Sequence, residues 1–143
     1  MATVLELERS TTPTVALLAH DAMKPHLLRL VRAHDDTLAR CRLIATRSTG
    51  QTILNACPLP IELLEGGPLG GDLQIAGMVV HRLVDAVVYL RDPQTAHPFE
   101  PDPHTLLRVC DVHDVPMATN AAAAEVLLGW VAARATHPSV RMS

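Results

Sequence analysis

Residues 14–19 read TVALLA, a short apolar run with β-branched residues that ends at His20-Asp21. The spacing typical of one helix face follows, in Met23, Leu27, Leu28, Leu30 and Val31. An apolar run, a polar turn and a helical period together indicate a buried strand, a loop and a helix. The rest of the chain repeats this order.

Four further runs of this kind occur, at Arg42–Ala45, Ile61–Leu64, Ala86–Leu90 and Pro116–Thr119. The helices expected after them pass through Ile53 and Leu54, cover Asp72–Val84, extend from about Asp102 to Val112, and end near Ala133. Such alternation predicts an α/β fold: a single three-layer domain with a five-stranded, mainly parallel sheet and helices on both faces. We expect one domain over residues 1–143, with a core of about 13–134 and frayed ends.

The composition argues against several classes of function. Hydrophobic residues make up 48% of the chain, with one Phe, one Tyr and one Trp, so the core must be aliphatic. A net charge of −3, without a basic stripe or stacking aromatics, argues against nucleic-acid binding. No apolar stretch is long enough to span a membrane, and the first residues lack a signal peptide's apolar run, so we expect a cytoplasmic protein. The three cysteines form no CxxC pair, and no histidine spacing suggests a metal site.

Polar residues gather after the predicted strands, whose carboxyl ends meet at one edge of a parallel sheet. Thr46, Arg47, Ser48, Thr49 and Gly50 place hydroxyls and main-chain N–H groups at a helix start, where a phosphate is the natural ligand. The alternative is a simple N-cap. Lys24, in the first predicted helix, could add a full positive charge or be a solvated side chain.

The run GGPLGGD at residues 66–72 holds four glycines, which allow a ligand to approach the backbone closely. It matches neither a P-loop nor GxGxxG. Asp72 stands at the start of the next helix, where it could serve chemistry or cap the helix. Turn or cap roles are equally open for Asp21, Asp92 and Asp102.

These motifs resemble the methylglyoxal synthase family. The similar segments are AHDAMK at 19–24, the loop 46–50, GPLGGD at 67–72 with Gln74, Asp92-Pro93, Pro101-Asp102 and PMATN at 116–120, in the same order and spacing over roughly residues 13–130. The resemblance implies conversion of dihydroxyacetone phosphate, a triose phosphate, to methylglyoxal and inorganic phosphate without a metal or organic cofactor. It also implies a homo-oligomer, commonly a hexamer.

By the same resemblance, Asp72 is the base that removes a C3 proton to give an enediol(ate) phosphate. His20 and Asp21 line the pocket, and Asp92 and Asp102 hold the polar network behind it. The phosphate is held by Lys24, Thr46, Ser48, Thr49 and Gly67, with Arg47 and Gly66 beside them.

Two positions depart from the family pattern. Phe99 stands where the family has a histidine beside the substrate oxygens, with His97 two residues earlier, and Arg47 stands where glycine is common. These differences define the alternative, a non-catalytic or weakly active phosphometabolite-binding module of the same fold.

Overall fold

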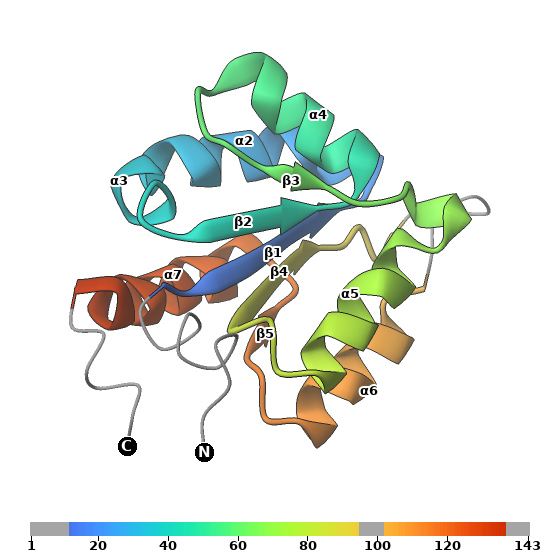
Figure 1. Ribbon diagram of the computed structural model, residues 1–143. Helices are drawn as coiled ribbons and strands as arrows, with labels where there is room; N and C mark the ends of the chain where they lie inside the picture. The colour runs from blue at the N-terminus through green and yellow to red at the C-terminus, as the bar shows by residue number, and fades with distance from the viewer. Residues whose placement is uncertain (1–11, 95–101, 137–143) are drawn as a thin grey trace.

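One sheet of five parallel strands forms the centre of the computed structural model, which describes residues 12–94 and 102–136 (Figure 1). The strands are β1 (Thr14–Ala19), β2 (Arg42–Ala45), β3 (Glu62–Leu63), β4 (Ala86–Leu90) and β5 (Met117–Ala118). Their order is β3-β2-β1-β4-β5, and Val15 of β1 pairs with Leu43 on one side and Ala86 on the other. The predicted fold class, a five-stranded parallel α/β sheet, is therefore confirmed.

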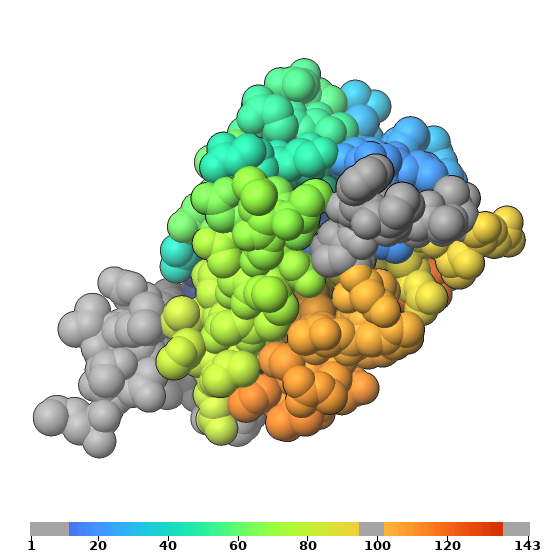
Figure 2. All heavy atoms as spheres, turned by 90° about the vertical axis from the view of Figure 1, so that its right-hand side faces the viewer, coloured from blue at the N-terminus to red at the C-terminus, as the bar shows by residue number. Residues whose placement is uncertain are grey.

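Helices cover both faces of the sheet. The α-helices are α2 (Lys24–Ala33), α3 (Asp35–Leu38), α4 (Arg47–Ala56), α5 (Gly71–Val80), α6 (His104–Val112) and α7 (Ala121–Thr136), and the 3-10 helices are η1 (Asp21–Met23) and η2 (Gly67–Leu69). Helices α2, α3, α4 and α7 pack on one face, and α5 and α6 lie side by side on the other (Figures 1 and 2). No helix in the described part of the chain is long and apolar enough to cross a membrane.

The central strands alternate their side chains between two aliphatic cores. Val15 and Leu17 of β1 pack toward α2 and α7, whereas Ala16 and Leu18 pack toward α5 and α6. Because the strands are buried on both faces, successive residues enter the two cores alternately, as expected for a parallel sheet covered by two helix layers.

Some helix boundaries differ from the sequence prediction. Helix α5 ends at Val80 rather than at residue 84, because Arg82 adopts a left-handed φ of 59°. The Leu83 N–H donates to the Met78 carbonyl and the Arg82 N–H to the Val79 carbonyl, each at 2.9 Å, which is the Schellman termination. The short helix α3 was not predicted, and α7 extends three residues past the predicted end, from Ala133 to Thr136.

The strand order fixes where a ligand can enter. From β1 the chain moves outward through β2 to β3, then returns to the other side of β1 for β4 and β5. The loops after β1 and β4 therefore diverge to opposite faces of the sheet. Sheets of this kind bind ligands at that switch point, outside the carboxyl ends of the strands.

Candidate functional site

A pocket of about 230 Å³ lies at the switch point, where β1, β2 and β4 end. Residues from the strand ends, η1, α2, α4 and η2 line it: Leu18, Ala19, His20, Asp21, Lys24, Thr46, Ser48, Thr49, Gly67, Pro68 and Tyr89. Segments far apart in sequence thus meet where the parallel topology predicts. We call this space the strand-end pocket.

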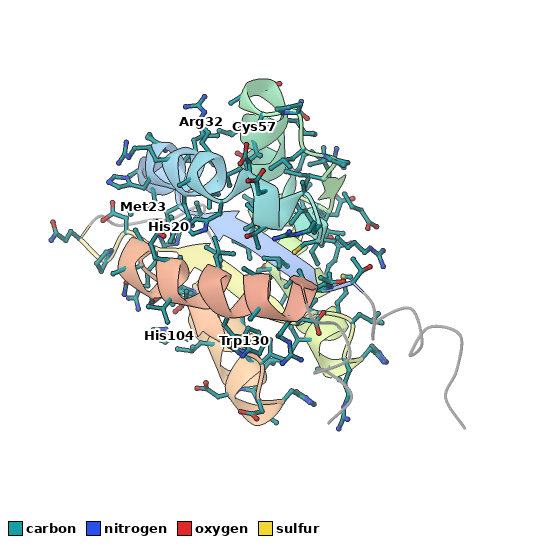
Figure 3. All side chains as sticks on the ribbon, turned by 90° about the vertical axis from the view of Figure 1, so that its left-hand side faces the viewer. His20, Met23, Arg32, Cys57, His104 and Trp130 are labelled. Atoms are coloured by element: carbon teal, nitrogen blue, oxygen red, sulfur yellow. The ribbon has the colours of Figure 1, made fainter. Side chains whose placement is uncertain are left out.

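His20 follows β1 directly and is 5% exposed (Figure 3). The Asp92 N–H donates to His20 Nδ1 at 2.9 Å, so this ring nitrogen is the acceptor. The neutral imidazole therefore carries its proton on Nε2 and can act there as a hydrogen-bond donor. The Tyr89 ring packs against His20 edge to face, with ring centroids 5.5 Å apart and an interplanar angle of 82°.

Lys24 is the cation of the pocket. Its Nζ contacts the Asp21 carboxylate and the Ser48 hydroxyl, and its side chain is 14% exposed. These two contacts draw the ammonium group from α2 across to the start of α4. A positive charge held beside a helix N-terminus favours an anionic ligand.

The first turn of α4 supplies main-chain donors to the same place. Thr46 precedes this helix in extended conformation (φ −63°, ψ 152°) and makes no side-chain capping hydrogen bond. Thr46 and Thr49 are buried, and both line the pocket. Thr46 is thus the N-cap residue of α4 by position, but its hydroxyl does not cap the helix. The first-turn N–H groups of Ser48 and Thr49 lie beyond the reach of intrahelical carbonyls, so they suit a bound phosphate.

The glycine-rich loop brings α5 against this turn. Gly70 has φ +94°, which side chains rarely adopt, and it precedes the helix. A Cβ on Gly71 would lie 2.0 Å from the Glu65 carbonyl oxygen and 3.0 Å from Thr46 Cγ2. Only glycine allows this close approach at position 71.

Asp72 is buried in the first turn of α5, 6% exposed. The helix has Gly70 as its N-cap residue and no side-chain capping bond, so the capping alternative for Asp72 is wrong. Asp72 neighbours Gly71, which packs on Thr46 of the pocket wall, but it is not itself a lining residue.

Two other predicted carboxylates, those of Asp92 and Asp102, do not line the pocket. Asp92 serves through its main chain, which holds His20, and its side chain accepts the Gln94 N–H at 3.1 Å. Asp102 is exposed and accepts the His104 N–H at 2.9 Å, which lowers the pKa of the Asp102 carboxyl; the His104 ring adds to this effect. For Asp102, the structure therefore shows a local helix-start contact.

The strand-end pocket gathers most of the predicted phosphate-binding residues, but Arg47 and Gly66 do not line it. Arg47 is the exposed first residue of α4. Phe99 and His97 lie outside the described residues. The pocket wall also contains four residues that were not predicted, Leu18, Ala19, Pro68 and Tyr89. The signal for Tyr89 was a single phenol near the end of an aliphatic strand.

Within residues 12–94 and 102–136, no group of three or more His, Cys, Asp or Glu side chains is arranged to hold a metal ion. The strand-end pocket instead combines an ammonium group, hydroxyls and main-chain N–H groups with an imidazole donor. This donor set matches a small phosphorylated molecule with a polar oxygen near its phosphate.

Comparison with known proteins gives a consistent result. The family model described as the MGS-like domain matches residues 26–119. Two curated proteins named methylglyoxal synthase, from Burkholderia mallei (strain SAVP1) and Burkholderia pseudomallei (strain K96243), are each 52% identical over 126 residues, covering 88% of this chain and 97% of theirs. The crystal structure of methylglyoxal synthase from Elizabethkingia anophelis NUHP1 aligns with a TM-score of 0.80 at 38% identity, covering 82% of this chain and 77% of that one.

Proposed function

Because the chain belongs to the methylglyoxal synthase family, we propose that it is a carbon–oxygen lyase that converts dihydroxyacetone phosphate to methylglyoxal and inorganic phosphate. The observation that carries the proposal is the strand-end pocket, where Lys24 and the first turn of α4 face the same space as His20. A phosphate grip and a neutral hydrogen-bond donor in one small pocket are what this reaction requires.

The first step is proton removal. Asp72 takes a proton from C3, the hydroxymethyl carbon, and the C–H electron pair moves into an enediolate phosphate. His20 donates a hydrogen bond from Nε2 to the developing oxyanion. The buried position of Asp72, beside the pocket wall at Thr46, supports its role as the base.

The second step is phosphate loss. The enediolate electrons expel phosphate as the C1–O bond breaks, and a proton then adds to C1 as the enol becomes the methyl ketone. Cleavage requires the C–O bond to align with the enediolate π system. Lys24, Ser48 and Thr49 would hold the phosphate in that orientation, since their groups converge on one side of the pocket.

The test is methylglyoxal formation and phosphate release from dihydroxyacetone phosphate by the purified full chain. We expect turnover that falls by about a hundred- to ten-thousandfold in Asp72→Asn, because a positioned general base contributes that much. The variant should still bind phosphate, since Asp72 is not among the residues that would grip it. Wild-type turnover no greater than that of Asp72→Asn would refute the proposal.

The second candidate is a phosphometabolite-binding module without catalysis. It is favoured by the fact that the phosphate-gripping residues line the pocket whereas Asp72, Asp92 and Asp102 do not. The module predicts that phosphate or dihydroxyacetone phosphate raises the melting temperature although no product forms. Phe99→His separates the two: a large gain in turnover would identify Phe99 as the catalytic deficiency.

We also propose a homo-oligomer, with a hexamer as the expected form, and a cytoplasmic location. Val126 and Trp130 leave apolar surface exposed on α7, which supports self-association. Light scattering after size-exclusion chromatography tests the assembly, with a monomer at micromolar concentration as the contrary result. Cell fractionation beside a cytoplasmic marker tests the location, which recovery in another fraction would disprove.

A further inference from the structure

The backbone of Glu65 lies between the N-terminal ends of α4 and α5. The Glu65 N–H donates to Gln74 Oε1 at 2.8 Å, and the Glu65 carbonyl oxygen receives a longer contact of 3.4 Å from the Arg47 N–H. The same oxygen lies where a Cβ of Gly71 would approach to 2.0 Å. The main chain of this one residue is thus contacted by the first residue of α4 and by a side chain from α5, and the first residue of α5 approaches it closely.

The two contacts from α5 come from one side of that helix. Gln74 follows Gly71 by three residues, and residues at this spacing are neighbours on a helix surface. Gly71 abuts the Glu65 carbonyl group while Gln74 accepts the Glu65 N–H. The start of α5 therefore contacts the Glu65 main chain on both sides of its Cα.

The helices joined in this way carry different parts of the proposed chemistry. The first turn of α4 offers the phosphate grip at Ser48 and Thr49, and the first turn of α5 carries Asp72. The separation of grip and base decides whether the base meets the carbon that it must deprotonate. A displacement of about 1 Å can cost a hundredfold in rate.

We propose that Gln74 is a positioning residue that fixes the backbone of Glu65 and, through it, the separation between the phosphate grip on α4 and Asp72 on α5. This inference rests on the proposed function. Gln74 acts as an acceptor through its amide oxygen, so glutamate, which has the same length and also accepts, can replace it. Alanine leaves the Glu65 N–H to water.

The site of the hydrogen bond determines which measurement responds. Gln74 is exposed, so water satisfies the freed N–H in Gln74→Ala and the fold loses little stability. A water molecule on this N–H does not hold the Glu65 backbone in one position. The effect should therefore appear in kcat rather than in the melting temperature or in the affinity for phosphate.

The experiment compares Gln74→Ala, Gln74→Glu and Gln51→Ala in the full chain. Gln51 is the matched control because it is an exposed glutamine on α4 whose amide only reaches Asn55 at 3.5 Å among the described residues. We expect Gln74→Ala to lower kcat about tenfold with less than a twofold change in the dissociation constant of inorganic phosphate. Gln74→Glu should recover kcat to within about threefold of wild type, and Gln51→Ala should match wild type.

Hydrogen exchange of the Glu65 amide provides a readout that needs no turnover. Gln74→Ala should speed this exchange about tenfold, and Gln74→Glu should restore it. Unchanged exchange in Gln74→Ala overturns the inference whether or not methylglyoxal forms, and so does faster exchange with kcat equal to that of Gln51→Ala. If the wild-type protein makes no methylglyoxal but Gln74→Ala still speeds the exchange, the positioning role of Gln74 is supported and only the lyase assignment is contradicted.

Discussion

Two hollows in the molecule invite comparison. The strand-end pocket is about 230 Å³, whereas a groove between the end of α6, β5 and α7 is about 630 Å³. This α6–α7 groove is lined by Cys110, Asp111, Asp114, Val115, Pro116, Met117, Ala118, Ala123, Val126, Leu127 and Trp130, and Figure 3 labels Trp130 on the side of α7 next to α6. If volume identified the functional site, the groove would be preferred.

The chemistry of the walls reverses that preference. In the strand-end pocket, polar groups from separate segments hold one another, as Lys24 does with Asp21 and Ser48. The carboxylates of the groove, Asp111 and Asp114, both belong to the end of α6, where Asp114 has a left-handed φ of 57°. Converging, mutually bonded polar groups at a strand switch point therefore indicate a functional site better than size does.

The largest expected effect comes from a glycine substitution next to the wall of the strand-end pocket. Gly71→Ala should lower turnover about a hundredfold or more and destabilise the fold by about 1–3 kcal/mol, because the new Cβ meets the Glu65 carbonyl oxygen at 2.0 Å. Gly77→Ala and Gly129→Ala are controls, since nothing lies within 4 Å of a Cβ at either position. Both should keep full activity and gain up to about 1 kcal/mol in helix stability. Kinetics and urea unfolding measure these changes. Equal activity and stability of the three variants would contradict the role given to the close approach at Gly71.

A second test removes the cation of the pocket and the aromatic residue of the groove. Lys24→Met should raise the KM for dihydroxyacetone phosphate about ten- to a hundredfold, because a charge-assisted contact to phosphate contributes about 1.5–3 kcal/mol. Trp130→Ala should change KM less than twofold, although it removes the ring that Arg134 covers at 4.3 Å. Steady-state kinetics distinguish them. If Trp130→Ala raised KM as much as Lys24→Met, the groove would share in substrate binding.

A smaller effect is expected at the contact between Tyr89 and His20. Tyr89→Leu should lower kcat about two- to tenfold, since an aromatic pair contributes about 0.5–1.5 kcal/mol to holding the imidazole. Tyr89→Phe keeps the ring and should stay within about twofold of wild type. Nitrogen-15 NMR of the His20 ring should show the Nε2-protonated tautomer in wild type and in Tyr89→Phe. A loss of kcat in Tyr89→Phe equal to that in Tyr89→Leu would assign the effect to the hydroxyl instead.

The sequence predicted the strands well because buried parallel strands are short, continuous apolar runs that are easy to recognise. The runs at 14–19, 42–45 and 86–90 match β1, β2 and β4 in full. Once those strands are known, the parallel topology alone predicts that the loops after them meet at one edge of the sheet. The same logic brought His20, Lys24, Thr46 and Gly67 into one expected site, and the structure places all four on the strand-end pocket.

What the sequence could not decide depended on geometry across the fold. The end of α5 was missed because Arg82 takes a left-handed conformation that glycine or asparagine usually adopts. Thr46, Asp72 and Asp102 are all residue types that favour helix starts, so sequence left capping open for each. In the structure, Asp102 accepts a hydrogen bond from the start of its helix. Thr46 is the N-cap residue of α4 but makes no side-chain capping bond, and the N-cap residue of α5 is Gly70 rather than Asp72.

The last expected effect is on stability rather than on turnover and concerns Cys110, which lines the groove yet is fully buried. Burial raises the pKa of its thiol from 9.0 to about 11, and the nearby Asp111 charge acts in the same direction. Between these pH values the unfolded chain ionises this thiol while the folded chain keeps it protonated, so folding stability falls as pH rises from about 9 to 11. The loss should approach about 1–2 kcal/mol in the free energy of unfolding and should be absent from the Cys110→Ala variant. Urea unfolding of both proteins at pH 8 and pH 10.5 measures the difference, and parallel loss in the two would show that the groove wall admits water to the thiol.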